Sequence, residues 1–256
     1  MSRAPNRDRA DIQGLRAVAS LLVATYHVWF HRVSGGVDVF FVVSGFLITR
    51  SLVGRLGPDG RLDVAGFWAG LARRLLPTAL MVIVATSLAA PWVLPRVLWA
   101  STAEDGLASL AYVANWRLAF EAVDYLARDR TPSPFQHFWA LAVQGQFYLL
   151  WPILVLGASR LAAARGRTLK QMLTFTLAAT FVVSFTYAAI STWRDQPFAY
   201  FDTGARLWEF ALGGLVAASG GRLTARWSPL LGWMGLAGVV ATGVLFPVSQ
   251  VFPGPM

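Results

Sequence analysis

The stretch from Leu15 to Val33 reads LRAVASLLVATYHVWFHRV and holds His27 deep inside a run of apolar residues. About 20 such residues are enough for a helix to cross the hydrocarbon core of a bilayer. The next apolar run begins at Val37 and carries Asp38 as its second residue. Ionisable groups are costly at membrane depth, so they indicate a functional site there. The sequence therefore predicts chemistry inside a bundle of transmembrane helices.

The composition supports an all-α, polytopic membrane protein. Hydrophobic residues make up 56% of the 256 residues and charged residues only 14%, and the mean hydropathy is +0.53. A soluble domain has about 25% charged residues. The sequence shows no repeat and no second soluble domain, so we interpret residues 1–256 as a single membrane domain. The expected spans are about 15–33, 37–54, 75–95, 138–158, 173–193, 204–219 and 229–247.

The charge pattern indicates a lipid bilayer, and no nucleic acid, as the partner of this chain. The net charge is +9. The basic residues fall in the short gaps between apolar runs, as the positive-inside rule requires. The chain has no cysteine, which excludes disulfides and thiol chemistry.

The run 104–126 is expected to be re-entrant or to lie on the outer face. If it crossed the bilayer, the basic loop after the span 138–158 would lie outside the cell, against the positive-inside rule. With the segment outside, the N-terminus and most basic loops lie in the cytoplasm. Its charges are too many for comfortable exposure to lipid. They are Glu104, Asp105, Arg117, Glu121 and Asp124.

Arg16 and His27 are expected to lie on one face of the first helix. They are eleven residues apart, which is three turns and about 16 Å along the axis. A cation at the inner mouth with a base deeper in the membrane fits a channel for a long anionic ligand. The alternatives are an arginine that reaches the lipid interface and a histidine that packs against a neighbouring helix.

Asp38 and Ser44 are the polar candidates on the second predicted helix. The hairpin returns Asp38 to the outer end of the first helix, where its carboxylate could fix the tautomer of an imidazole. The alternative is an N-cap or first-turn acid, favoured by the helix dipole. Ser44 precedes Gly45, and this pair allows a helix or a slender ligand to approach closely.

Two arginine-containing pairs are further candidates. Arg73 and Arg74 stand where a loop is expected to become a helix, and paired guanidinium groups suit phosphates. Their alternative role is to anchor the topology. Arg206 and Glu209 are three residues apart on a later helix, which allows an ion pair of structural or functional purpose.

Polar and aromatic residues also gather in the run from Gln136 to Pro152, QHFWALAVQGQFYLLWP. Amides in an apolar span need hydrogen-bond partners, so we expect them to face the interior. The candidates for substrate contact in this run are His137, Trp139, Gln144, Gln146 and Tyr148.

Taken in order, these segments resemble the acyltransferase-3 family of membrane-bound O-acyltransferases. The first match is the pair Arg16 and His27, similar to the family's Arg-x10-His. The others are GGVDVFFVVSGFLI (35–48), ARRLLP (72–77), HFWALAVQGQFYLLWP (137–152) and DTGARLWEFALGGLVA (202–217).

The resemblance implies transfer of an acyl group, commonly acetyl from acetyl-CoA, to a hydroxyl of an extracytoplasmic carbohydrate. It implies a multi-pass location in a bacterial plasma membrane, and no metal. His27 would be the catalytic base or a transient acyl carrier. The other catalytic candidates are Asp38 and Glu209. The residues implied for the coenzyme are Arg16, Arg73, Arg74 and Ser44, and Arg206 would join the candidates of 137–152 on the acceptor side.

The chain departs from the family pattern in two places. The family's Glu-Glu pair is Gln144-Gly145 here, so Asp38 or Glu209 is expected to supply the carboxylate. Family members usually continue for several more helices, and we therefore expect a C-terminally incomplete domain. The alternative functions are a transporter or flippase of a glycan or lipid, and a non-catalytic relative.

Overall fold

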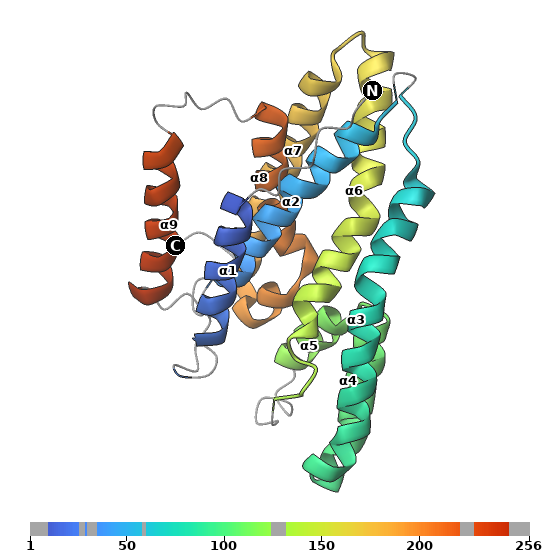
Figure 1. Cartoon of the computed structure of the whole chain (residues 1–256), viewed down its shortest axis with the longest axis vertical. Coiled ribbons are helices and arrows are strands. Elements are labelled where there is room, and N and C mark those ends of the chain that lie inside the picture. Colours follow the sequence, from blue (N-terminus) through green and yellow to red (C-terminus); the bar gives the residue numbers. More distant parts are fainter. Residues whose placement is uncertain are drawn as a thin grey trace.

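The computed structural model describes residues 10–25, 29, 35–57, 60–123, 132–220 and 228–245, and within these ranges the regular structure is entirely helical. The all-α prediction is confirmed for this part of the chain (Figure 1). A short 3-10 helix, η2 (Arg96–Leu98), precedes α4. The α helices are α1 (Ala10–Thr25), α2 (Gly36–Arg55), α3 (Val64–Val93), α4 (Trp99–Leu110), α5 (Ala114–Val123), α6 (Phe138–Ala164), α7 (Leu169–Phe201), α8 (Thr203–Ser219) and α9 (Ser228–Leu245).

Four of the helices, α2, α3, α6 and α7, are long and apolar enough to cross a membrane. They include the predicted spans 37–54, 75–95, 138–158 and 173–193, apart from the last two residues of 75–95. The prediction that the loop becomes a helix at Arg73 and Arg74 was wrong, because α3 begins at Val64. Asp63 explains the earlier start, since its carboxylate accepts a hydrogen bond from the Gly66 amide at 2.8 Å and caps the helix. The pair Arg73 and Arg74 therefore lies within a helix and not at its beginning.

α7 consists of a long helix and a short one that meet at Asp195, whose backbone is not helical (φ −156°, ψ 84°). Asp195 Oδ1 accepts a hydrogen bond from the Phe198 amide at 3.1 Å. Pro197 has no amide hydrogen and is tolerated in the first turn of the short helix. This corner turns the chain toward α8, and it places Tyr200 and Phe201 against the start of α6.

The segment 104–126, as far as it is described, forms two short helices, α4 and α5. They have 12 and 10 residues and are joined by a turn at 111–113, where Tyr112 has φ 57°. Helices of this length rise only about 18 Å and 15 Å, roughly half of the hydrocarbon thickness. In Figure 1, α4 lies along the lower part of α3. Neither helix is long enough to cross a bilayer, as predicted for this segment.

α2, α6 and α8 run in the same direction. Ser44 contacts Gln144, and further along both helices Thr49 contacts Trp151. Only one long helix, α3, returns the chain between α2 and α6. The α4–α5 segment therefore adds no net crossing, which supports the prediction made from the charges of the loops.

The contact between α2 and α8 depends on glycine. A Cβ atom on Gly213 would overlap the Val42 carbonyl oxygen, and one on Gly45 would overlap the Phe210 carbonyl oxygen. Close approach of backbones at small residues is typical of membrane helix pairs. This approach brings the polar side chains of α2 and α8 together.

We expect Gly213→Ala to lower the stability of the protein by about 1–3 kcal/mol, because the added methyl group forces α2 and α8 apart. Gly157→Ala is the matched control, since a Cβ on Gly157 meets nothing within 4 Å. Alanine is the better helix former by about 1 kcal/mol, so the control should be at least as stable as the parent. Thermal unfolding in detergent measures both. Equal stability of the two variants would contradict the close contact.

Candidate active site

A buried cluster of charges joins the start of α2 to α8. Arg206 Nη1 lies 2.6 Å from Asp38 Oδ1 and 2.9 Å from Glu209 Oε1. The side chains of Arg206 and Glu209 are 1% and 0% exposed, and that of Asp38 is 16% exposed. The predicted ion pair within one helix is confirmed, and Asp38 is a third member that the sequence did not predict. Two carboxylates are held together here because one guanidinium group reaches both.

Aromatic rings enclose the guanidinium group of this cluster. It lies 4.6 Å from the ring centroid of Tyr200 and 5.3 Å from that of Trp139. Arg206 Nε also donates to the Tyr200 carbonyl oxygen at 2.9 Å. A cation is attracted to ring faces, most strongly where water is excluded. Trp139, a predicted substrate contact, is only 6% exposed. Its ring forms part of the wall around the guanidinium group of Arg206.

The carboxylate of Asp38 faces α8 and does not cap its own helix. Gly35 is the N-cap of α2, and no side chain caps that position. Asp38 lies in the first turn, where the helix dipole also favours a negative charge. His27, the predicted base, lies outside the described residues, so its pairing with Asp38 stays a prediction.

A second polar group lies further along α2 and α6. Gln144 Nε2 donates to Ser44 Oγ at 2.6 Å and to Tyr148 Oη at 2.7 Å. Both amide hydrogens are then used, and both hydroxyl oxygens act as acceptors. Ser44 also hydrogen-bonds the Tyr148 oxygen, so at this donor-rich site the Tyr148 hydroxyl hydrogen is the one left for another acceptor.

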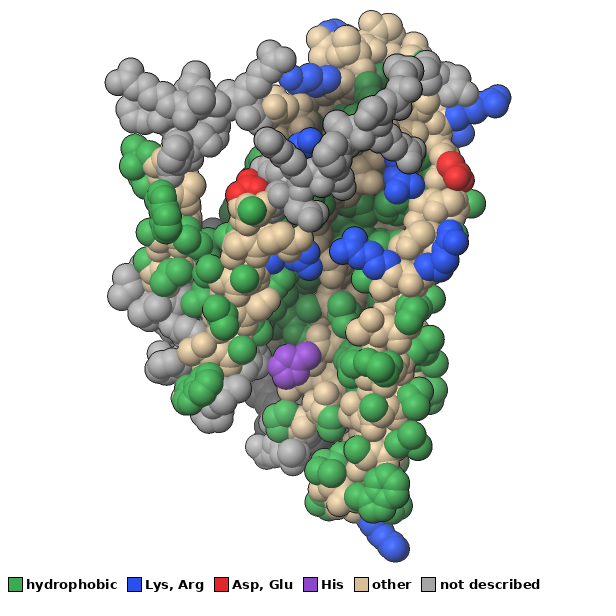
Figure 2. Space-filling view, viewed as in Figure 1, with side chains coloured by type: hydrophobic (Ala, Val, Ile, Leu, Met, Phe, Trp, Pro, Cys, Tyr) green, Lys and Arg blue, Asp and Glu red, His purple; other side chains and the backbone are tan. Residues whose placement is uncertain are grey.

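Arginine side chains border this second group. Arg16 and Arg74 are close enough to act electrostatically on the Tyr148 hydroxyl. Arg74 and Arg73 are exposed, and Arg16 is half-buried. Figure 2 shows Lys and Arg side chains on either side of a hollow between α1 and α3. The structure thus brings together three residues predicted for the coenzyme: Arg16, Arg74 and Ser44.

An aromatic layer lies among the helices that carry the two polar groups. The ring of Phe210 stacks on Phe41 at 4.7 Å and on Phe147 at 3.8 Å between centroids. Asp38 and Ser44 are six residues apart on α2, which is about 9 Å of helix rise. The charge cluster and the donor-rich site are therefore neighbours at different depths of one bundle.

Gln146 has all its hydrogen-bonding capacity taken by protein. Its Nε2 donates to the Tyr112 carbonyl at 2.8 Å and to Asn115 Oδ1 at 2.9 Å. Its Oε1 accepts from Thr203 Oγ1 at 2.6 Å and from Trp116 Nε1 at 3.3 Å. An amide has two donors and one oxygen with two lone pairs. This residue therefore positions α5 and the α7–α8 corner on α6.

Two further placements bear on the predictions for α6. His137 is the N-cap residue of that helix and is exposed. Gly145, which replaces a family glutamate, faces Tyr112, because a Cβ there would overlap the Tyr112 ring. The roles of Tyr112 and Asn115 were missed from the sequence; the only signal was a tyrosine and an asparagine in the uncharged run 106–116. No group of three or more His, Asp or Glu in the described ranges could hold a metal ion.

Comparison with known proteins identifies the class to which this fold and site belong. The profile of a family described as "Acyltransferase domain" matches residues 9–253. This match covers nearly the whole chain, and the four long apolar helices agree with a membrane protein. The chain belongs to the acyltransferase-3 family. No solved structure matches it significantly.

Its relatives are bacterial O-acetyltransferases by name. The chain is 35% identical over 207 residues to "Putative peptidoglycan O-acetyltransferase YrhL" of Bacillus subtilis (79% of this chain, 32% of that protein). It is 38% identical over 148 residues to "Peptidoglycan O-acetyltransferase OatA" of Listeria monocytogenes (57% and 24%). It is 31% identical over 211 residues to "O-acetyltransferase OatA" of Staphylococcus aureus (80% and 34%). The matches thus cover about a third or less of the length of these proteins.

Proposed function

We propose that this chain transfers an acetyl group from acetyl-CoA in the cytoplasm to a hydroxyl group of an extracytoplasmic cell-wall glycan. The family and the names of the relatives support O-acyl transfer and a glycan acceptor. The observation that carries the proposal is the pair of polar sites at different depths, one rich in arginine and one holding a buried Arg206–Asp38–Glu209 cluster. Such a pair suits a donor and an acceptor that arrive from opposite sides.

The proposed topology has seven crossings, by α1, α2, α3, α6, α7, α8 and α9, with the N-terminus in the cytoplasm. The common direction of α2, α6 and α8 supports it. In this topology the α4–α5 segment and the charge cluster lie toward the outside. The basic residues of the α6–α7 loop lie inside, as the positive-inside rule requires.

The donor would bind in the hollow between α1 and α3. Guanidinium groups of Arg16, Arg73 and Arg74 would hold the phosphates, because such groups form paired hydrogen bonds with phosphate oxygens. The slender pantetheine arm would pass Ser44, whose neighbour Gly45 has no side chain. The hydroxyl group of Tyr148 would donate to an oxygen of the donor.

The chemistry we propose uses His27 as a general base. The imidazole takes the proton of the acceptor hydroxyl as its oxygen forms a bond to the thioester carbonyl carbon. The carbon–sulfur bond then breaks, and the coenzyme thiolate takes the proton back from the imidazolium. Asp38, fixed by Arg206, would orient the ring, and Glu209 would keep the guanidinium group in place.

The proposal is tested by turnover of the purified protein in liposomes with acetyl-CoA and an N-acetylglucosamine trimer. Release of the free thiol together with an alkali-labile acetyl ester on the trimer is the expected result. Passage of the trimer across the membrane without esterification would identify a transporter instead. Absence of both would leave the non-catalytic alternative.

We expect Arg74→Ala to raise the KM for acetyl-CoA by about tenfold with little change in kcat, because a charge-assisted hydrogen bond to phosphate is lost. Arg167→Ala is the control, since Arg167 is also an exposed arginine but lies in the α6–α7 loop. Steady-state kinetics at varied acetyl-CoA measures both. If Arg74→Ala lowers only the amount of correctly inserted protein and leaves KM unchanged, the arginine is a topological anchor.

A further inference from the structure

An apolar pocket of about 440 Å³ lies between α3 and α4, and we call it the α3–α4 pocket. Its size falls within the range of about 300–1,000 Å³ typical of small-molecule sites. None of the described residues that line it is charged, and none belongs to the site described above. The pocket is therefore a separate place in which an apolar molecule fits.

Helical spacing explains the shape of the α3–α4 pocket. Ile83, Ser87 and Ala90 are four and three residues apart, so they share one face of α3. The same kind of spacing puts four lining residues on one face of α4, namely Trp99, Ala103, Gly106 and Leu110. Because α4 runs back along α3 (Figure 1), large side chains lie at both ends of the pocket and small ones in the middle. The result is an elongated space, which a hydrocarbon chain can fill.

Counting along α3 places the pocket at membrane depth. Arg73 and Arg74 mark one polar boundary of this helix, since guanidinium groups avoid hydrocarbon. Ile83 and Pro91 are nine and seventeen residues beyond Arg74, which is about 14 Å and 26 Å along an axis that crosses about 30 Å of hydrocarbon. Trp92 follows and is 84% exposed, as expected at the opposite interface. The pocket therefore lies in the half of the bilayer away from the two arginines.

The surface around the pocket is apolar and continuous with it. Val84 and Leu88 of α3 are exposed beside it, and the exposed Leu107 of α4 lines it. Figure 2 shows hydrophobic side chains over the lower arm of the molecule, which α3 and α4 form. In a bilayer, lipid chains cover such a surface, so a lipid chain is the molecule that reaches the pocket.

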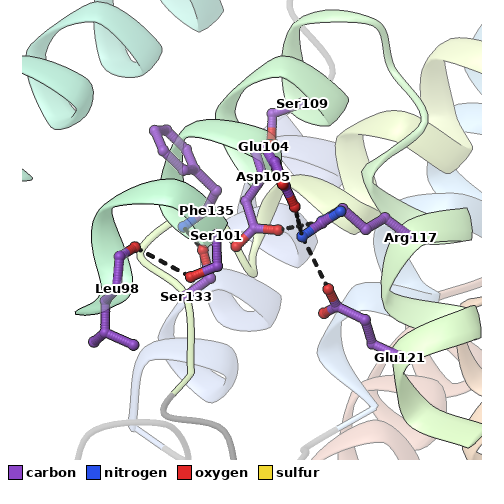
Figure 3. A network of polar contacts seen from close by, with 9 residues as sticks. All are labelled: Leu98, Ser101, Glu104, Asp105, Ser109, Arg117, Glu121, Ser133 and Phe135. Atoms are coloured by element: carbon purple, nitrogen blue, oxygen red, sulfur yellow. Dashed lines mark hydrogen bonds and ion pairs between the residues drawn. The ribbon is translucent and has the colours of Figure 1, made fainter. Parts of the chain in front are cut away.

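α4 is fixed to α5 more firmly than to α3. On the α5 side, Arg117 Nε lies 2.5 Å from Asp105 Oδ1 and its Nη2 lies 2.8 Å from Glu104 Oε2, and Figure 3 shows both acids of α4 reaching Arg117. On the other side, Phe67 and Ile83 are the only buried residues among the thirty of α3, all of which the structure describes. Membrane helices associate through close packing. A chain in the pocket would supply packing that α3 and α4 lack.

We propose that the α3–α4 pocket binds one acyl chain of a membrane phospholipid and that this chain joins α4 to α3. Phospholipid chains make up the hydrocarbon at this depth, and the many weak contacts of a chain with both helices favour its binding. The inference depends on α3 crossing the bilayer and is independent of acyl transfer.

The test is photo-crosslinking of the full chain in nanodiscs of phosphatidylglycerol. A trace of the same lipid carries a diazirine within one acyl chain. Peptide mapping gives the ratio of crosslinks at residues 103–110 of α4 to crosslinks at Val182 and Val183, which are exposed on α7 outside the pocket. We expect an excess on α4. Ala90→Phe, whose ring fills the pocket from α3, should lower the ratio by about tenfold or more.

Ala89→Phe is the matched control. It makes the same change one residue earlier on α3, where the side chain is exposed and does not line the pocket. The ratio should stay within about twofold of the parent value, as for other surface substitutions. Ala103→Phe fills the pocket from α4 and should act as Ala90→Phe does, so the test does not depend on one variant folding.

Three outcomes would overturn the proposal. Equal crosslinking of α4 and α7 in the parent, or a ratio unchanged in both filled variants, would mean that lipid only surrounds the helices. Competition by a polyprenyl phosphate but not by excess unlabelled phosphatidylglycerol would assign the pocket to another lipid. Crosslinks between two protein chains at residues 103–110, in place of lipid, would make it a contact between copies.

Discussion

Arg206→Gln is expected to lower the free energy of unfolding by about 3–5 kcal/mol, the largest effect on stability of any single substitution considered for this chain. The guanidinium group holds Asp38 and Glu209, and its own side chain is 1% exposed. Its removal leaves two carboxylates without a cation. Thermal or denaturant unfolding in detergent measures the loss.

Two further variants separate loss of the cation from loss of packing. In Arg206→Gln combined with Glu209→Gln only Asp38 is left as an acid, so part of the stability should return. Arg194→Gln removes an exposed arginine from α7 and should change stability by less than about 0.5 kcal/mol. If Arg206→Gln is as stable as the parent, the cluster does not hold α2 to α8.

His27→Ala is expected to lower the rate of acetyl transfer by about 10²–10⁴-fold, the usual contribution of a general base. The substitution should leave the protein folded in detergent, because the contacts described above between α2 and α6 and between α2 and α8 are kept. Transfer of labelled acetyl to the N-acetylglucosamine trimer, measured at saturating donor, gives the rate.

His31→Ala is the control for this prediction, because it removes the same side chain four residues further along the same stretch. It should keep transfer within a few-fold of the parent. A folded His27→Ala protein with the parent rate would end the role of this imidazole as a base.

The helices could be predicted from the sequence because their cause is local. Each long apolar run must satisfy its backbone hydrogen bonds internally in lipid, and only a helix does so within one segment. Boundaries were less predictable. α3 begins at Val64 because the side chain of Asp63 caps it, and composition alone did not distinguish that aspartate from other loop residues.

The direction of the helices was also predictable, from the arginines of the loops. The common direction of α2 and α6 requires that the charged segment 104–126 add no net crossing, and charge counting gives the same answer. The positive-inside rule therefore predicted that α2 and α6 run in the same direction.

The site could be predicted only in part. Spacing indicated the Arg206–Glu209 pair, since residues three apart share a helix face. The pairing of Asp38 with Arg206 joins residues 168 positions apart, and it depends on how closely α2 and α8 pack at glycine. The same limit applies to Gln146, whose amide needed partners but whose partners come from α5 and α8.

The proposed reaction carries an acetyl group from a thioester on one side of the membrane to a hydroxyl group on the other. Its most direct test is transfer in sealed proteoliposomes of known orientation. With acetyl-CoA only on the face bearing Arg73 and Arg74, and the N-acetylglucosamine trimer only on the face bearing α4 and α5, we predict acetyl esters on the trimer. Transfer that occurs only when both reactants share one compartment would contradict this transfer across the membrane. The absence of transfer in either arrangement would contradict it as well.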